Sequence, residues 1–350
     1  MRILVTGATG FVGRYAVAAG LAAGHEIRAV VRPSSTDATL RAVPGAGRLD
    51  IARLDLRSPA GIAGALEGVE TVVHLAAAKE GDFYSQFAGT VTATENLLTA
   101  MTGAGVERLV GVSTFSVYDY VNLPAGSLVT EDSPVDASPA KRDEYARTKL
   151  IQERLFTDFS DAGNPVVIVR PGMIYGRGNL WHALLGAEVG PRFLRVGSRA
   201  ILPMAYVENV ADGLIAAAAA LGPDDSPVAG EVINIVDDHL PTQEAYVAAV
   251  TAMVDHPPTI TVPWPVMRSL AAALQWGNDL LVGGRAKFPG IVVPERLHAR
   301  FKPLRYANAK AKRLLDWSPR FSLDEAIARS VEPRCGEAPR SGDREVDAGG

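Results

Sequence analysis

The sequence is poor in the residues that build metal centres and disulfide frameworks. Its 350 residues include one cysteine, Cys335, and six scattered histidines without a His-Glu-x-x-His pattern. A single cysteine cannot form an intramolecular disulfide or supply a cysteine-based metal site. We therefore expect no metal centre, and we expect a protein of a reducing compartment, the cytoplasm.

Long apolar runs and basic clusters are also missing. The longest apolar helix is expected around Leu214–Leu221, which is too short to span a bilayer. No signal peptide fits, because a strand and a glycine motif are expected at the first residues. The net charge of −4 argues against a nucleic-acid surface. With 47% hydrophobic residues, the chain should be soluble and form one large α/β unit or two unequal domains.

The strongest functional pattern lies in the first fourteen residues. An apolar run over Ile3–Val5 precedes Gly7, Gly10 and Gly13, and an alanine-rich helix is expected over Tyr15–Ala23. A strand, a glycine turn and a helix form the context of a dinucleotide fingerprint. The glycines would allow a tight turn, close approach of a pyrophosphate and packing of the helix on the strand. The alternative is an ordinary strand-to-helix loop. The predicted cofactor-binding residues here are Gly7, Thr9, Gly10, Phe11, Val12 and Gly13.

The end of the next strand bears on the choice of cofactor. The strand is expected at Glu26–Val31 and is followed by Arg32. An acidic residue near this position would bind the ribose hydroxyls of NAD. Arg32, with Ser34 and Ser35 close by, instead suits the 2′-phosphate of NADP and cannot accept hydrogen bonds from a diol. We favour NADP, with NAD as the alternative cofactor. An arginine that is merely solvated at a strand end is the competing interpretation.

Three further strands should extend the sheet, at Ile51–Leu54, Thr71–Leu75 and Arg108–Val112. Ligands bind at the carboxyl ends of strands in such sheets. Small residues there leave room for a flat cofactor, although they are equally common in plain helix–sheet packing. The candidates at these ends are Asp55 and Leu56 beside adenine, Leu75, Ala76 and Ala77 beside the cofactor, and the hydroxyl residues Ser113, Thr114 and Ser116.

A helix expected over Asp143–Phe159 carries Tyr145 and Lys149. Their spacing of four residues places both side chains on one face. A cation beside the phenol, with a bound nicotinamide, would lower the pKa of Tyr145 from about 10 by on the order of two to three units. Tyr145 would then be an acid/base near neutral pH. Taken alone, the pair is a common feature of helix surfaces.

Taken together, these motifs resemble the extended short-chain dehydrogenase/reductase family, in its NAD-dependent epimerase/dehydratase and 3β-hydroxysteroid dehydrogenase-like forms. The resemblance covers roughly residues 1–330. The segments that carry it are Thr6–Gly13, Ser113–Tyr118, Tyr145–Lys149, Val166–Gly176, Tyr206–Ala211 and Val232–Asp238.

The resemblance implies a role for each catalytic candidate. Tyr145 would be the acid/base, Lys149 would bind the nicotinamide ribose and lower the pKa of the tyrosine, and Thr114 would hydrogen-bond the substrate oxygen. Pro171, in the Arg-Pro turn, would contact the cofactor. The implied activity is reversible hydride transfer between NAD(P) and a secondary alcohol or ketone. The alternatives are a nucleotide-sugar epimerase or dehydratase that retains NAD, and a non-catalytic nucleotide sensor.

Three positions depart from the family pattern. Thr90 replaces an asparagine, although Asn96 in the same helix is kept, and Asp119 stands where a glycine commonly follows the Val-Tyr pair. Arg32 replaces the acidic residue of the NAD-using epimerases, which weakens the epimerase interpretation.

The expected fold is α/β, a doubly wound, Rossmann-type parallel sheet of about seven strands. It should occupy residues 1–171, with 207–236 returning to it, while 172–206 and 237–330 should form a second, smaller, mostly helical substrate domain. Residues 331–350 should be a disordered tail.

The apolar segment 263–282 is interpreted as core packing, with a wall for an apolar substrate or a surface for a membrane or a partner as alternatives. We expect a small-molecule substrate and no stable membrane insertion. The only protein partner that we consider is a second copy of the chain, in a homodimer.

Overall fold

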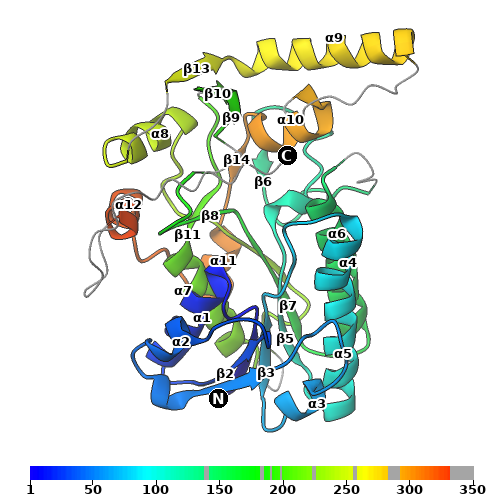
Figure 1. Ribbon diagram of the computed structural model, residues 1–350, viewed down its shortest axis with the longest axis vertical. Helices are drawn as coiled ribbons and strands as arrows, with labels where there is room; N and C mark the ends of the chain where they lie inside the picture. The colour runs from blue at the N-terminus through cyan, green and yellow to red at the C-terminus, as the bar shows by residue number, and fades with distance from the viewer. Residues whose placement is uncertain are drawn as a thin grey trace.

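The computed structural model describes residues 1–137, 142–181, 185–189, 191–197, 199–222, 226–254, 258–282 and 292–331. A parallel sheet with helices on both faces forms its larger part (Figure 1). Its seven strands lie in the order β12-β7-β5-β4-β1-β2-β3, and all neighbours are parallel. The strands are β1 (Arg2–Thr6), β2 (Glu26–Val31), β3 (Leu49–Arg53), β4 (Thr71–His74), β5 (Arg108–Val112), β7 (Val166–Pro171) and β12 (Val232–Ile235). The doubly wound fold is confirmed, and the strand ends differ from the expected ones by one or two residues at most.

The strands are apolar because both faces of the sheet are covered. In β1, Ile3 and Val5 pack into one core and Leu4 into the other, as the period of two requires. One face is covered by α1 (Phe11–Ala22), α7 (Val207–Ala220) and α11 (Ala309–Leu315). The other face is covered by α3 (Ile62–Ala65), α5 (Ala93–Ala104) and α6 (Glu144–Asp161). Short helices at α2 (Ala38–Arg41), α4 (Phe83–Phe87), η1 (Ala46–Arg48) and η3 (Phe115–Val117) lie in the connections.

Two connections differ from the expected ones. From the sequence, a helix is expected over Thr90–Thr102, but it begins earlier, because α4 runs through a π-helical turn, Ala88–Thr92, into α5. The segment 119–140, rich in proline, glycine and serine, is expected to be a loop. It contains β6 (Leu128–Val129), which pairs with β14 (Arg305–Tyr306). A hydrophobicity pattern does not reveal such a short strand, because its partner lies far away in the sequence.

The remaining elements lie beyond the carboxyl ends of the sheet strands, in the upper part of Figure 1. β8 (Met173–Tyr175) pairs with β11 (Met204–Tyr206), and a second small sheet has the order β13-β10-β9. The bounds are β9 (Ala187–Val189), β10 (Arg192–Val196), β13 (Thr259–Val262), α8 (Gln243–Thr251), α9 (Trp264–Val282), α10 (Pro294–Phe301) and α12 (Leu323–Val331). The predicted tail, 331–350, lies outside the described residues except for Val331.

Helix α9 corrects the expectation of core packing for the apolar segment 263–282. Trp264, Met267 and Ala271 on one side are buried in a cluster with α10. The other side is open, with Trp276 at 69% and Leu280 at 64% relative exposure. Only the side of α9 that packs against α10 is buried, although apolar residues also occur on its other side. Within the described residues, no helix combines the length and the apolar character needed to cross a bilayer.

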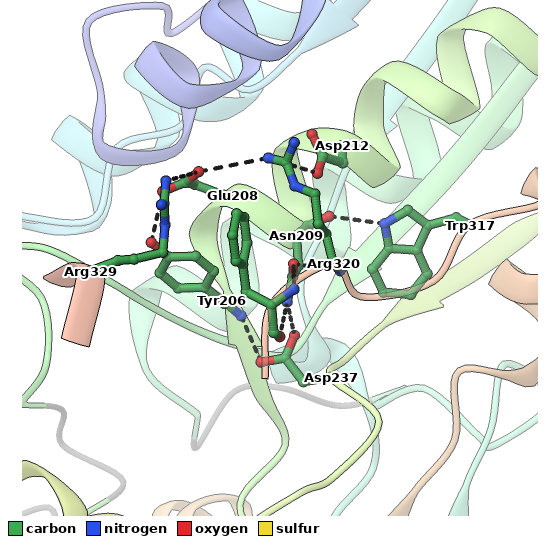
Figure 2. A network of polar contacts seen from close by, with 9 residues as sticks. Tyr206, Glu208, Asn209, Asp212, Asp237, Trp317, Arg320 and Arg329 are labelled. Atoms are coloured by element: carbon green, nitrogen blue, oxygen red, sulfur yellow. Dashed lines mark hydrogen bonds and ion pairs between the residues drawn. The ribbon is translucent and has the colours of Figure 1, made fainter. Parts of the chain in front are cut away.

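Polar contacts join the start of α7 to the C-terminal part of the chain (Figure 2). The Asn209 side chain donates to Asp237 at 2.9 Å and to the Phe321 carbonyl at 3.0 Å, and it accepts from the backbone N–H groups of Arg320 and Phe321. The Trp317 indole donates to the Asn209 carbonyl at 3.0 Å. We call Asn209, Asp237, Trp317, Arg320 and Phe321 the Asn209 network. It links the end of β12 to the last helices.

Candidate active site

The glycine turn between β1 and α1 has no room for side chains. Gly7 has a φ of +63°, and a Cβ atom there would lie 3.0 Å from the Ala76 nitrogen. At Gly13, a Cβ atom would lie 2.1 Å from the Gly7 carbonyl oxygen. Gly10 is the N-cap of α1 and provides no side-chain cap, so the N–H groups of the first turn are available to an anion. The turn therefore has the shape that a pyrophosphate requires.

A cavity of about 540 Å³ opens at this helix end. Its lining includes Phe11 and three cationic residues, Arg14, Lys79 and Arg177. The Arg14 guanidinium lies over the Phe11 ring, and its buried Nε has no hydrogen-bond partner among the described residues. Positive charge and an unused donor at a helix N-terminus fit a phosphate group. The sequence analysis missed the three cations, because they come from segments that no motif connects. Of the other predicted residues in this turn, Thr9 is partly exposed and Val12 packs into the core.

Arg32 is exposed at the end of β2, and its guanidinium has no hydrogen bond or ion pair with another described residue. The neighbouring arginines, in contrast, are paired with carboxylates. Arg41 and Arg53 pair with Asp37 at 2.9 and 3.0 Å. Arg57 binds both carboxylate oxygens of Asp55. The hydrogen bond from Arg57 is the main cause that lowers the pKa of Asp55, and the charge of Arg32 adds to it.

Hydrogen bonds from side chains fix the backbone of the residues that are predicted to contact adenine and nicotinamide. Asn96 donates to the Leu56 carbonyl at 2.8 Å and so fixes the turn after β3. After β4, the N–H groups of Leu75 and Ala76 both donate to the Thr6 hydroxyl at 3.1 Å. Thr90, the residue that replaces an asparagine, accepts from the Ala78 N–H at 3.0 Å. Ala77, between these anchors, is partly buried.

Thr114 and Tyr145 are brought together by two helix caps. Thr114 follows β5 and caps η3 by accepting from the Ser116 N–H at 3.2 Å. Asp143 caps α6 by accepting from the Ala146 N–H at 2.8 Å. Burial raises the pKa of Tyr145 to about 12, and a hydrogen bond with the Thr114 side chain partly opposes the rise. The Ser113 hydroxyl is buried without a hydrogen-bond partner among the described residues.

In the protein without a bound nicotinamide, Lys149 does not offset the rise in the pKa of Tyr145, and the lower pKa expected in the presence of the cofactor stays a prediction. Lys149 is buried, and its ammonium donates to the Val112 carbonyl at 2.6 Å and to the Gln152 side chain. No hydrogen bond joins Lys149 to Tyr145 within the described part of the chain. Burial lowers the pKa of Lys149 to about 7, while the charge of Glu153 raises it and that of Lys79 lowers it. Desolvation therefore dominates both groups.

Buried ion pairs and hydrogen bonds fix the segments around these side chains. Arg170 pairs with Glu153 of α6 through two bonds of 2.8 Å and lies over the Tyr118 ring. Arg142 donates to the Ser116 carbonyl at 2.6 Å. Pro171 ends β7 in a buried position at the same sheet edge. The sequence analysis assigned no role to Glu153, Arg142 or Gln152.

Comparisons with known proteins agree with this geometry. The profile of the NAD dependent epimerase/dehydratase family matches residues 3–235. The chain is 29% identical to a 3 beta-hydroxysteroid dehydrogenase/Delta 5-->4-isomerase of Mycobacterium tuberculosis, over 94% of this chain and 89% of that protein. It is 30% identical to a sterol-4-alpha-carboxylate 3-dehydrogenase, decarboxylating, of Mus musculus, over 77% of this chain and 75% of that one.

A solved structure gives the corresponding match in fold. The UDP-glucose-4-epimerase from Stenotrophomonas maltophila, with bound NAD and formylated UDP-arabinopyranose, superposes with a TM-score of 0.71 at 20% identity. The match covers 94% of this chain and 96% of that chain.

Proposed function

This chain belongs to the NAD-dependent epimerase/dehydratase family of extended short-chain dehydrogenases/reductases, and we propose that it oxidises or reduces a secondary alcohol or ketone of the hydroxysteroid type. The observation that supports the proposal is that a hydrogen bond with the Thr114 side chain partly opposes the rise in the pKa of Tyr145, while the buried Lys149 lies one turn further along the same helix. The substrate class comes from the relatives, whose names describe dehydrogenases of 3β-hydroxysteroids and sterols.

The residues present fit a nicotinamide dinucleotide. The glycine turn that a Cβ atom would fill, the cationic cavity and the unused Arg14 Nε would receive the pyrophosphate. Asp55 and Leu56, which follow β3, would face the adenine. Leu75, Ala76, Ala77 and Pro171 would line the path toward Lys149. When bound, the cofactor supplies or accepts the hydride.

The protein's own groups would place the substrate oxygen and move its proton. Thr114 would donate a hydrogen bond to that oxygen. With a pKa of about 12, Tyr145 is protonated at neutral pH and is ready to donate its proton to a ketone oxygen. In the opposite direction, Tyr145 would receive the alcohol proton after Lys149 and the bound ligands have lowered its pKa. An ammonium has three donors, and Lys149 uses two of them within the protein, so one remains for a ribose hydroxyl.

We also propose NADP as the preferred cofactor. Arg32 carries the argument, because the other arginines of this edge are neutralised by Asp37 and Asp55 while its guanidinium has no ion pair among the described residues. A free guanidinium at the end of β2 suits a ribose 2′-phosphate.

The test combines a steady-state assay with an analysis of bound nucleotide. Purified protein is mixed with a 3β-hydroxysteroid and NADP or NAD, and formation of the reduced cofactor is followed. We expect turnover that depends on added cofactor, and we expect denatured protein to release little nucleotide. Stoichiometric release of NAD, with turnover of a nucleotide sugar and none of the steroid, would instead identify a cofactor-retaining epimerase.

A further inference from the structure

The Lys149 ammonium is bound by a side chain that the proposed chemistry does not use. Gln152 lies almost one turn further along α6 and is fully buried, at 0% relative exposure. Its Oε1 accepts from the Lys149 Nζ, and the Val112 carbonyl accepts from the same ammonium at 2.6 Å. A buried amide has to satisfy both its donors and its acceptor. The partners of the Gln152 amide therefore determine which of its ends faces Lys149.

Two acceptors fix the orientation of this amide. The Gln152 Nε2 lies 2.8 Å from the Thr94 hydroxyl and 3.3 Å from the Ala76 carbonyl. Thr94 donates its only proton to the Thr90 carbonyl at 2.6 Å, so toward Gln152 it can only accept. Both groups need an N–H donor, and a flipped amide would present an oxygen to them. The Gln152 oxygen is therefore aimed at Lys149 before any ligand binds.

The same chain of bonds reaches the backbone after β4. His74 Nε2 lies 2.9 Å from the Thr94 hydroxyl, whose proton is already used, so His74 is the donor. Burial lowers the pKa of His74 to about 3, which leaves the ring neutral, and its Nδ1 then accepts from Thr6 at 2.7 Å. The Thr6 oxygen accepts the N–H groups of Leu75 and Ala76. We call Lys149, Gln152, Thr94, His74 and Thr6 the Lys149 network.

We propose that Gln152 is a positioning residue that holds Lys149 charged and oriented for the cofactor, and that it couples this lysine to the backbone of Leu75 and Ala76. The inference rests on the proposed function, in which Lys149 binds the nicotinamide ribose. It adds a residue outside the Thr114, Tyr145 and Lys149 set. It also gives a physical link between two predicted cofactor contacts, because one fixed amide is bonded to Lys149 and to the Ala76 carbonyl.

The charges around Lys149 explain why a neutral acceptor matters here. Glu153 on the same helix is paired with Arg170 and so is partly compensated. Lys79, in the segment after β4, repels the ammonium, and His74 is neutral. With its pKa lowered to about 7, Lys149 would lose its charge just above neutral pH. A hydrogen bond to the charged form opposes that loss. Removing the Gln152 oxygen should therefore lower the pKa of the lysine further.

The test measures the dissociation constant of NADH as a function of pH, by quenching of protein fluorescence. NADH is the probe because it lacks the 2′-phosphate, which itself titrates near pH 6. In the parent protein, affinity should fall as the pH rises through the pKa of Lys149. Gln152→Leu should move the midpoint of this fall down by about one pH unit. Gln152→Glu, which keeps an acceptor and adds a negative charge, should move the midpoint up.

Two controls separate this inference from the proposed function. Gln243→Leu makes the same change at another fully buried glutamine, in α8, and should leave the midpoint where it is. Lys149→Met should abolish the pH-dependent fall. If Lys149→Met keeps the parent profile, the proposed role of Lys149 is wrong. If Lys149→Met abolishes the fall while both Gln152 variants keep the parent midpoint, the role of Gln152 is overturned and that of Lys149 stands. Should Gln152→Leu fail to fold, the upward shift in Gln152→Glu, or its absence, decides alone.

Discussion

The molecule contains two buried polar networks that differ in one respect. In the Asn209 network, the amide uses both of its donors and both lone pairs of its oxygen within the protein. In the Lys149 network, the Gln152 amide also uses its oxygen and its nitrogen within the protein. The Lys149 ammonium, however, has only two hydrogen-bond partners among the described residues and keeps one donor free. A fully satisfied network rigidifies the fold, whereas an incomplete one is suited to a ligand.

The two networks also differ in the partners of their buried charged groups. Burial raises the pKa of Asp237 to about 6, and hydrogen bonds from Asn209 and the Tyr206 N–H oppose the rise. Its carboxylate accepts hydrogen bonds from the Tyr206 N–H and the Asn209 side chain, which Figure 2 shows, and from the Tyr175 hydroxyl. Burial lowers the pKa of Lys149, whose partners within the protein are neutral oxygens. From this comparison we expect changes in the Asn209 network to affect stability and, if the proposed function holds, changes in the Lys149 network to affect binding and catalysis.

The largest effect that would test this division is expected at Tyr145. Tyr145→Phe removes the proton donor while keeping a ring of similar volume, and it should lower kcat by a factor of about 10² to 10⁴. The NADH dissociation constant and the midpoint of urea unfolding should change little. Steady-state kinetics, a binding titration and an unfolding curve give the three values. Normal turnover in this variant would contradict the proposed acid/base.

The opposite pattern is expected in the Asn209 network. Asn209→Leu leaves the Arg320 and Phe321 N–H groups without their acceptor and removes one donor from the Asp237 carboxylate, which should reduce the free energy of unfolding by about 3 kcal/mol. Under conditions where the variant is folded, kcat should stay near the parent value.

The matched control for that change is Asn308→Leu. Asn308 also donates to a carbonyl and a carboxylate, those of Val236 and Asp238, but it is only partly buried, so that water can replace the lost contacts. Its loss should be below about 1.5 kcal/mol. If urea unfolding gives equal losses in the free energy of unfolding for the two variants, the buried Asn209 contacts contribute no more to stability than the partly exposed contacts of Asn308.

A smaller effect than those at Tyr145 and Asn209 is expected at Arg32, outside both networks. Arg32→Asp should reverse the cofactor preference, since a carboxylate repels the 2′-phosphate and accepts from a ribose diol. The loss of the charge-assisted contact should weaken NADPH binding by about ten- to a hundredfold relative to NADH. Dissociation constants of both cofactors at low salt provide the measurement. A parent protein that prefers NADH, with no change in the variant, would remove Arg32 from the cofactor site.

Local patterns in the sequence predicted the sheet and the elements that carry the candidate residues. The glycine turn lies between β1 and α1, and Tyr145 and Lys149 lie on α6, as expected, because both patterns depend on neighbours a few residues away. The roles of these residues stay predictions. Strand β2 was predicted at Glu26–Val31, where it lies, because Ile27 and the apolar run Ala29–Val31 stand between a glycine turn and Arg32-Pro33. Ser322 followed three residues later by Glu325 is another local pattern, typical of a capping box, and the Ser322 N–H donates to Glu325 at 2.9 Å.

The features that sequence analysis missed depend on contacts between distant segments. Gln152 acquires its role only when α6 meets the ends of β4 and β5, and no periodicity signals that. The rise in the pKa of Tyr145 in the protein without ligand was missed, because burial is a tertiary property while the Tyr145–Lys149 spacing is a local one. The exposed side of α9 was missed for the same reason, since apolar composition does not reveal whether a neighbour covers it.

The most direct test of the central claim follows the hydride itself. A 3β-hydroxysteroid with deuterium on its carbinol carbon is incubated with the enzyme and oxidised cofactor, and the products are analysed by mass spectrometry. In the proposed reaction the cofactor would accept the hydride from the carbinol carbon, here as deuteride, and ionised Tyr145 would receive the hydroxyl proton, so that the alcohol becomes a ketone. We predict one deuterium in the released reduced cofactor for each ketone formed, at a much lower rate in Tyr145→Phe. Ketone formed without deuterium in the cofactor, or label transfer that is equally fast without the Tyr145 hydroxyl, would contradict the account.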